Sequence, residues 1–407
     1  WTSGCWSDAV RSMQELARLA ETARSTVLDG VIQRRDVPDS ATYFGSGRAR
    51  NLRDLARELG ADTVIVDGEM SPGQLQRLEQ VTGVKVVDRT WLILDIFAQH
   101  ARSREGKAQV DLAQLEYLLP RLRGWGESMS RLGGGIGTRG PGETKIETDR
   151  RRIRTRISRL RRQIAAMSVA REVSRRNRRG SALPSVAIVG YTNAGKSSLL
   201  NRLTSAEVLV HDELFATLDP TVRRCRTTGG REFTLTDTVG FVSHLPHQLV
   251  EAFRSTMEEV AQADLLVLVV DGSTPEANRQ IEAVRDVLRE VQADSVPEIV
   301  VINKGDIADP DTVHEIRSRN PEALVISAQT GAGIDSLLGD IAEHLPVPAE
   351  EVDVVVALDR GDLVARLHEE GEVKGVDYSP SGIHVIGLAN KELARKLRDA
   401  QVNSENG

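Results

Sequence analysis

Hydrophobic and polar positions alternate with two different periods along the chain, and together they predict an α/β fold. Between residues 26 and 88, the short apolar runs VLDGVIQRR, DTVIVDG and VKVVD alternate with the amphipathic stretches RARNLRDLARELG and SPGQLQRLEQ. Such runs predict strands, and apolar residues spaced three or four apart predict helices. Ser71 before Pro72 predicts a helix start. We therefore expect a small amino-terminal α/β domain with parallel strands.

Helical periodicity dominates the next part of the chain. From Trp91 to about Arg123 the pattern is helical throughout, with apolar residues at three- and four-residue spacing. After a glycine-rich stretch, residues 143–179 predict a long helix or a helical hairpin. Between Arg150 and Arg179 this segment is rich in arginine and nearly free of acids, as in RRRIRTRISRLRRQ.

Strands and helices then alternate regularly from Leu183 to about Pro346. The runs SVAIVG, EFTLTDTVG, DLLVLVVDGS, EIVVINKGD and ALVISAQ predict strands with helices between them, which is typical of a doubly wound sheet. Residues 352–397 predict a small α+β part. The expected domains are 1–130 (α/β and helical), 131–182 (glycine-rich tip and arginine-rich helix), 183–347 (doubly wound) and 348–407 (α+β).

Composition narrows the class of protein. The 407 residues, 40% of them hydrophobic, can bury the cores of two or three domains. A net charge of −6 gives no overall case for nucleic-acid binding, so such a role must come from local charge. Cys5 and Cys225 indicate neither a disulfide framework nor a zinc site, and we expect a cytoplasmic protein without a membrane span. Because Trp1 opens the chain, we expect upstream residues, including part of a first strand, to be missing.

Two glycine-bearing stretches compete as phosphate sites. The residues GYTNAGKSS, from Gly190 to Ser198, lie between the apolar run SVAIV and a predicted helix, and they contain the pattern G-x-x-x-x-G-K-[ST]. In that pattern backbone N–H groups face phosphate oxygens, Lys196 reaches the β- and γ-phosphates, and Ser197 offers a hydroxyl to Mg²⁺. The stretch GGGIGTRGPGET, from Gly133, has no strand before it and no Lys-Ser pair after it, so it predicts a flexible tip.

Three further motifs specify the nucleotide. DTVG, at residues 237–240, follows a predicted strand, where Asp237 can hold Mg²⁺ through water and the Gly240 N–H can contact the γ-phosphate. In NKGD, Asp306 can accept hydrogen bonds from the two donors that guanine has and adenine lacks. SAQ, from Ser327, follows another predicted strand beside the base. We therefore predict a site for GTP and GDP with Mg²⁺. Its expected contacts are Gly190, Tyr191, Thr192, Asn193, Ala194, Gly195, Lys196, Ser197, Ser198, Asp237, Thr238, Val239, Gly240, Asn303, Lys304, Gly305, Asp306, Ser327, Ala328 and Gln329.

The arginine-rich helix and the glycine-rich tip predict contact with RNA. A helix with charges of one sign repels itself, and a small tip can enter a cavity lined by phosphates. The alternatives are a solvated helix face and a plain linker. The expected RNA-binding residues are Arg139, Lys145, Arg150, Arg151, Arg152, Arg154 and Arg156.

The blocks GYTNAGKSSLLN, LFATLDPTVRR, DTVGFV, NKGD, DRTWLILDIFAQHARSREGKAQVDLAQLEYLLPRLRG and GPGETKIETDRRRI together resemble the HflX family of ribosome-associated GTPases. The resemblance covers nearly the whole chain. It implies a GTP hydrolase that binds the large ribosomal subunit and its RNA and helps to split stalled or idle ribosomes, and we expect a monomer.

The resemblance also implies a first switch at LFATLDPT. Residues Phe215, Ala216, Thr217, Leu218 and Asp219 would then contact the nucleotide, and Thr217 would bind Mg²⁺, with Thr221 as the alternative. Lys196, Thr217 and Gly240 are the expected catalytic residues.

Position 241 predicts slow intrinsic hydrolysis. Many GTPases place a glutamine there to orient the attacking water, and Phe241 cannot do so. The ribosome or backbone groups would have to replace it; a catalytic role for His244 or His247 is the alternative to surface positions. Asn193 suggests K⁺ as a further cofactor, because potassium-stimulated GTPases carry an asparagine in this loop.

Two other functions remain open at this point. One is a GTP-gated protein that binds or remodels RNA without acting on ribosomes, which strong binding to naked RNA would favour. The other is a regulatory switch that binds a protein partner, which binding insensitive to salt would favour.

Overall fold

The computed structural model describes residues 6–122, 141–179, 183–204, 214–215, 221–242, 254–346 and 350–401, which form two compact units. The first unit holds residues 6–122, 141–167 and 214–215. The second holds the remaining described residues. No helix in these ranges is long and apolar enough to cross a membrane.

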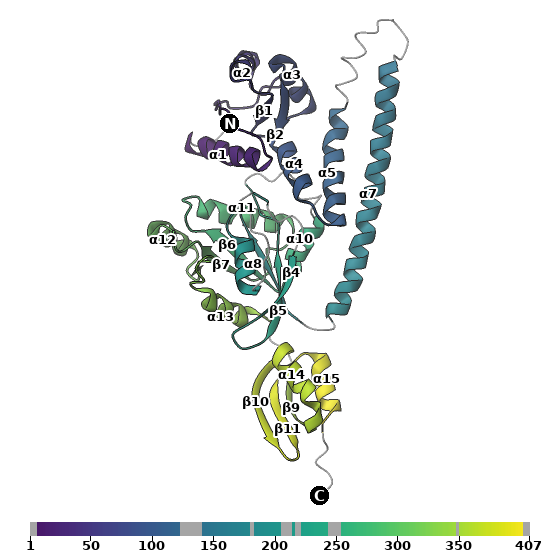
Figure 1. The fold of residues 1–407 in the computed structure, drawn as a ribbon, viewed down its shortest axis with the longest axis vertical. Helices are drawn as coiled ribbons and strands as arrows, with labels where there is room; N and C mark the ends of the chain where they lie inside the picture. Colours follow the sequence, from purple (N-terminus) through teal and green to yellow (C-terminus); the bar gives the residue numbers. More distant parts are fainter. Residues whose placement is uncertain are drawn as a thin grey trace. The chain divides into compact units, whose positions relative to one another are not determined.

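A small α/β layer forms the amino-terminal part of the first unit (Figure 1). Its elements are α1 (Trp6–Thr22), α2 (Ser46–Leu59), β1 (Thr63–Val66), α3 (Pro72–Thr82) and β2 (Lys85–Asp88). The two strands are parallel, with Thr63 opposite Lys85. The Ser71 hydroxyl accepts a hydrogen bond from the Gln74 N–H, and the Gln74 side chain accepts one from the Ser71 N–H, which confirms the predicted start of α3.

One predicted strand of this layer is wrong. Residues 25–38, which contain VLDGVIQRR, form neither helix nor strand. Val27 and Leu28 remain 42% and 53% exposed, and the sheet made by the described residues here contains β1 and β2 alone. Apolar character therefore did not produce strand pairing in this run.

The helical part of the first unit is divided where the sequence predicted continuity. Helix α4 (Arg89–His100) ends before Ser103, whose hydroxyl accepts a hydrogen bond from the Gly106 N–H at 2.8 Å and so starts α5 (Arg104–Arg121). Helix α7 (Pro141–Arg179) is one continuous helix rather than a hairpin. It lies beside α5 (Figure 1), joined by a cluster that includes Ala108, Leu112, Ile157 and Leu160.

A buried charge cluster connects the α/β layer to the end of α5. The Asp88 carboxylate is fully buried, and it accepts hydrogen bonds from the Trp91 N–H at 2.9 Å and from the Arg121 guanidinium at 3.2 Å. Arg121 also donates to the Met70 carbonyl at 2.8 Å and stacks on the Tyr117 ring. Burial is the main reason that the pKa of Tyr117 lies above its ordinary value.

A six-stranded sheet in the order β4-β5-β3-β6-β7-β8 organises the part of the second unit between residues 183 and 346. All its pairs are parallel except β4 with β5. This confirms the doubly wound class and adds β4, which the sequence had suggested only as a switch. The elements are β3 (Ser185–Gly190), α8 (Lys196–Thr204), β4 (Thr221–Arg226), β5 (Glu232–Asp237), α10 (Arg254–Ala261), β6 (Leu265–Asp271), α11 (Ala277–Glu290), β7 (Glu298–Asn303), α12 (Pro310–Arg319), β8 (Leu324–Val325) and α13 (Ile334–His344).

Side chains alternate between the two faces of this sheet. Val186, Ile188 and Val267 share a core with α8 and α13. Their neighbours in sequence point to the opposite face, where α11 packs on β3 and β6. The carboxyl ends of β3, β5 and β7 therefore deliver the loops that follow them to the same edge.

The carboxy-terminal elements form a separate α+β layer, as predicted. An antiparallel sheet has the order β10-β11-β9, and α14 and α15 share its core. The elements are β9 (Glu350–Val356), a 3₁₀ turn (Leu358–Arg360), α14 (Gly361–Glu370), β10 (Glu372–Ser379), β11 (Gly382–Ala389) and α15 (Lys391–Asp399).

Candidate functional site

The loop from Gly190 to Ser198 has the geometry of a phosphate cradle. It follows the buried strand β3, and α8 begins at Lys196, so the helix amino terminus faces the loop. Gly195 has φ +92°, and a Cβ there would overlap the Asn303 amide. A side chain at this position would therefore push the loop away from Asn303, the first residue of the base motif NKGD (303–306).

Lys196 is held at the centre of this loop. Its side chain is buried, and Nζ donates hydrogen bonds to the Gly190 carbonyl at 3.1 Å and the Tyr191 carbonyl at 2.8 Å. Burial lowers the pKa of Lys196 to about 8, and the Asp237 carboxylate opposes that change. A phosphate placed beside Nζ would supply a second anion and favour the charged form.

Ser197 and Asp237 bring two hard oxygen donors together at this edge. The Ser197 hydroxyl donates to Asp237 Oδ2 at 2.8 Å, and Asp237 is fully buried at the end of β5. A hydroxyl and a carboxylate at this separation fit the oxygen coordination that Mg²⁺ prefers. Thr221, the alternative switch ligand, is opposite Asp237 in the β4–β5 pair.

The segment after Asp237 is fastened to the phosphate loop by backbone hydrogen bonds. The Thr192 N–H donates to the Phe241 carbonyl at 2.7 Å, and the Phe241 N–H donates to the Gly190 carbonyl at 3.1 Å. Thr238, beside Val239 in this segment, donates its hydroxyl to the Ile188 carbonyl at 2.7 Å. The Phe241 ring is 1% exposed, so its side chain belongs to the core.

The base motif is connected to the phosphate loop through Asn303. Its side-chain amide donates to the Ala194 carbonyl at 2.8 Å and accepts from the Ala328 N–H at 2.9 Å. The Gly305 N–H donates to the Ile326 carbonyl at 2.8 Å. Asp306 is exposed. The structure thus brings NKGD (303–306), SAQ (327–329) and the loop 190–198 together at the carboxyl edge of the sheet.

Two residues of this region were missed by sequence reasoning. Asp271 ends β6 and pairs with Lys304, with 2.6 Å between Oδ2 and Nζ. Its position at the carboxyl end of a neighbouring strand was the available signal. Arg202, on α8, donates to the backbone of the SAQ loop; no local pattern in the sequence indicates this contact.

Of the expected first switch at residues 214–221, the structure describes Leu214, Phe215 and Thr221. The Phe215 ring is 2% exposed and meets the Phe97 ring edge-on, with 4.6 Å between centroids. The Leu214 N–H donates to the Thr22 hydroxyl at 3.3 Å. Both contacts lie within the first unit. The expected site residues outside the described ranges are Ala216, Thr217, Leu218 and Asp219, and His244 and His247 also lie outside them.

The arginines of α7 divide into two groups. Arg156 and Arg161, which flank the apolar stripe, pair with Asp111 and Glu116 of α5 at 2.9 and 2.8 Å. The others described here that are exposed are Arg151, Arg152, Arg154, Arg159 and Arg162. Of the remaining predicted RNA contacts, Arg150 is half-buried, Arg139 lies outside the described residues, and Lys145 is placed only as part of the α7 backbone.

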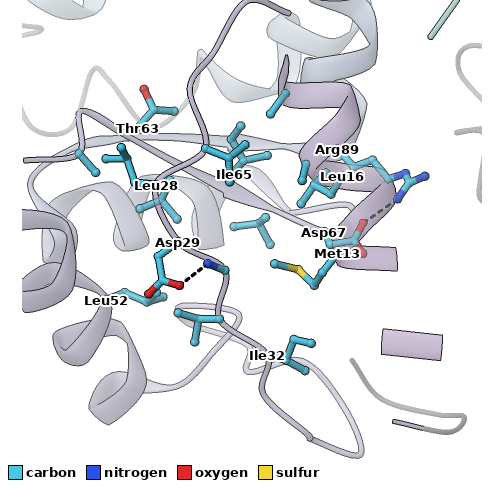
Figure 2. A pocket seen from close by; sticks show the side chains of 18 of the residues that line it. Met13, Leu16, Leu28, Asp29, Ile32, Leu52, Thr63, Ile65, Asp67 and Arg89 are labelled. Atoms are coloured by element: carbon cyan, nitrogen blue, oxygen red, sulfur yellow. Dashed lines mark hydrogen bonds and ion pairs between the residues drawn. The ribbon is translucent and has the colours of Figure 1, made fainter. Parts of the chain in front are cut away.

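The first unit also contains a cavity of about 1370 Å³ between α1, α2, β1 and residues 24–33 (Figure 2). Side chains such as Met13, Leu28 and Ile65 make its wall largely apolar. Two charged groups at its margin bind each other, since Asp67 accepts a hydrogen bond from Arg89 at 2.8 Å.

Three family models match the chain in succession. The model described as GTP-binding GTPase N-terminal matches residues 10–98, and the GTP-binding GTPase Middle Region matches residues 100–178. The model described as 50S ribosome-binding GTPase matches residues 185–304. These matches cover α1 through β7.

Curated relatives extend the similarity over nearly the full length. GTPase HflX of Caldanaerobacter subterraneus subsp. tengcongensis is 45% identical over 388 residues, covering 95% of this chain and 90% of the relative. GTPase HflX of Lacrimispora saccharolytica is 43% identical, covering 98% and 94%. GTPase HflX of Escherichia coli is 43% identical, covering 84% and 83%. The phosphate and base motifs meet at one sheet edge in a chain with this similarity, and the chain belongs to the HflX family of GTPases.

Proposed function

We propose that this GTPase binds the large ribosomal subunit through ribosomal RNA in its GTP-bound state and splits or rescues stalled or idle ribosomes. The observation that carries the proposal is the exposed arginine face of α7. The family model over residues 185–304, described as a 50S ribosome-binding GTPase, supports the same partner. We also propose that the chain acts as a monomer in the cytoplasm.

The geometry of α7 explains why this face is available. Ile157 and Leu160 face α5, so the opposite side of the helix presents Arg151, Arg159 and Arg162, and the exposed Arg154 lies at its margin. Within the described part of the chain, none of these four forms an ion pair with an acid. Successive turns of a helix lie about 5.4 Å apart, so the four guanidinium groups can follow a row of phosphates.

Nucleotide binding would be performed by the motifs at the carboxyl edge of the sheet. Ser197 and Asp237 would hold Mg²⁺ together with Thr217, and the ion when bound neutralises charge on the phosphates. Lys196 would exchange its two carbonyl acceptors for phosphate oxygens, and the Gly240 N–H would contact the γ-phosphate. Asp306 would accept hydrogen bonds from guanine.

Hydrolysis should be slow without the ribosome. The buried Phe241 ring cannot hydrogen-bond to a water, so this chain lacks the usual water-orienting side chain at that position. We propose that K⁺ bound near Asn193 adds charge stabilisation, because that side chain is exposed in the phosphate loop.

Sedimentation of ribosomes with the protein tests the proposal. Bound to a non-hydrolysable GTP analogue, the protein should comigrate with the large subunit and reduce the amount of intact ribosomes; bound to GDP, it should do neither. A variant with Arg151, Arg154, Arg159 and Arg162 all changed to Gln should lose this binding. Protein that remains at the top of the gradient in both states would refute the ribosomal function and make naked RNA or a protein partner the next candidate.

The salt dependence of binding supplies a matched control. Each arginine that contacts a phosphate contributes about one to the slope of log K against log salt. We expect Arg151→Gln to lower the slope by about that amount. Arg156→Gln should change the slope less, because Arg156 is already paired with Asp111. Equal effects of the two substitutions would show that the exposed face is not the contact surface.

A further inference from the structure

The loop that begins with SAQ is held from one side by a residue of the phosphate-binding helix. Arg202 lies in the second turn of α8, the helix that begins at Lys196. Its Nε donates to the Ala328 carbonyl at 3.0 Å, and its Nη2 donates to the Gln329 carbonyl. One guanidinium thus contacts two successive peptide groups 126 and 127 residues away.

Hydrogen bonds within this loop engage its backbone donors on both sides of Gln329. The Ala328 N–H donates to the Asn303 side chain, and the Thr330 N–H donates to the Ser327 hydroxyl at 3.1 Å. The N–H groups of Ser327, Gly331 and Ala332 also have acceptors inside the loop. Among the described residues, none accepts a hydrogen bond from the Gln329 N–H, which lies between these engaged donors.

Peptide planarity connects that donor to Arg202. In a trans peptide the C=O and the N–H point in opposite directions. The Ala328 carbonyl and the Gln329 N–H belong to one peptide group, so the hydrogen bond from Arg202 turns this N–H away from the guanidinium. Arg202 therefore fixes the direction of the Gln329 N–H.

We propose that Arg202 is a positioning residue for guanine recognition, which directs the Gln329 N–H at the O6 atom of the base. The proposal rests on the assignment of the guanine site to Asp306 and the SAQ loop. Guanine presents an acceptor at position 6, whereas adenine presents an amino group there, so a fixed N–H at this place favours guanine. Because Lys196 opens the same helix, Arg202 also connects phosphate binding with base recognition.

Three ligands separate positioning from general support of the site. IDP keeps O6 and lacks the 2-amino group, whereas 6-thio-GDP replaces O6 by sulfur, a weaker acceptor. Arg202→Met should raise the Kd for GDP and IDP about fivefold each, the value expected for one net hydrogen bond. The Kd for 6-thio-GDP should rise less than twofold, because that ligand gains little from the aimed N–H.

Two further variants complete the test. Arg202→Lys can donate to one of the two carbonyls, so it should recover part of the GDP affinity; it also provides a measurement if Arg202→Met does not fold. Arg289→Met removes an exposed arginine that pairs with Asp286 on α11, and it should change no affinity.

Equal weakening of all three ligands by Arg202→Met would overturn the proposal, because Arg202 would then only support the loop. Unchanged GDP affinity would overturn it as well. These titrations contain no ribosomes, so their result is independent of the proposed ribosomal function. Failure of the guanine site itself would appear separately, as a wild-type protein that does not prefer GDP to ADP.

Discussion

Asn303 provides the sharpest test of how the nucleotide site is assembled. Its buried amide joins the phosphate loop to the SAQ loop through hydrogen bonds to Ala194 and Ala328. Asn303→Ala would leave the Ala194 carbonyl without its donor and the Ala328 N–H without its acceptor. Each unsatisfied buried group costs about 1–3 kcal/mol. Because water can enter the space of the lost amide, we take the lower end of this range for each of the two groups and expect a total free-energy loss of about 2–3 kcal/mol.

That loss should appear in nucleotide affinity, because the proposed site places the nucleotide against both loops that Asn303 connects. A change of about 2–3 kcal/mol corresponds to a GDP affinity about 30- to 150-fold weaker. Equilibrium titration with a fluorescent GDP analogue measures the effect, and the melting temperature without nucleotide shows how much of the loss falls on the free protein. Asn278→Ala is the matched control, since the Asn278 amide makes an exposed hydrogen bond to Glu315. If Asn303→Ala bound GDP within threefold of the wild-type affinity, the assembly described here would be wrong.

Three other predictions follow from buried or exposed polar groups. Because the pKa of Lys196 is lowered to about 8 in the folded protein, the unfolded chain binds more protons between pH 8 and the ordinary lysine pKa of 10.5. The nucleotide-free protein should therefore gain stability as pH rises through that window, and Lys196→Met should lose this gain in melting curves; parallel curves for the two proteins would contradict it. Asp88→Asn should lower the free energy of unfolding by about 3 kcal/mol in urea, because it leaves the Arg121 guanidinium without its buried carboxylate; the exposed Asp54→Asn is the control, and a loss under 1 kcal/mol would refute the argument. GTP turnover should be faster in K⁺ than in Na⁺, and Asn193→Ala should remove the difference; equal wild-type turnover in the two salts would exclude the cation.

Local patterns predicted which motifs meet at the proposed nucleotide site, because each motif directly follows a strand. The apolar runs before Gly190, Asp237 and Asn303 fixed which sheet edge these residues share. Strand β4 was missed because its sequence TVRRCR contains three arginines, and its residues are mostly exposed on the sheet edge. The run VLDGVIQRR was predicted as a strand and is not one, since a strand also needs a neighbouring strand with which to pair.

Contacts between distant segments could not be predicted from the sequence. In the sequence, Arg202 cannot be distinguished from any other polar residue on a helix surface. Its hydrogen bonds are made to a loop more than 120 residues later. The packing of Phe215 on Phe97 is of the same kind, because nothing in either segment indicates the other. Such pairings depend on the tertiary fold rather than on local propensity or periodicity.

The burial of Phe241 has a consequence for the evolutionary options of this chain. Since the ring fills space in the core while the backbone is bound to Gly190 and Thr192, a glutamine at this position would start out facing apolar neighbours instead of the nucleotide. Burying its amide without partners would cost about 1–3 kcal/mol. A single change to glutamine would therefore lower stability before it could orient a water. Independent, rapid hydrolysis is thus not one mutation away, and the proposed dependence on an outside activator would be preserved by packing as well as by chemistry.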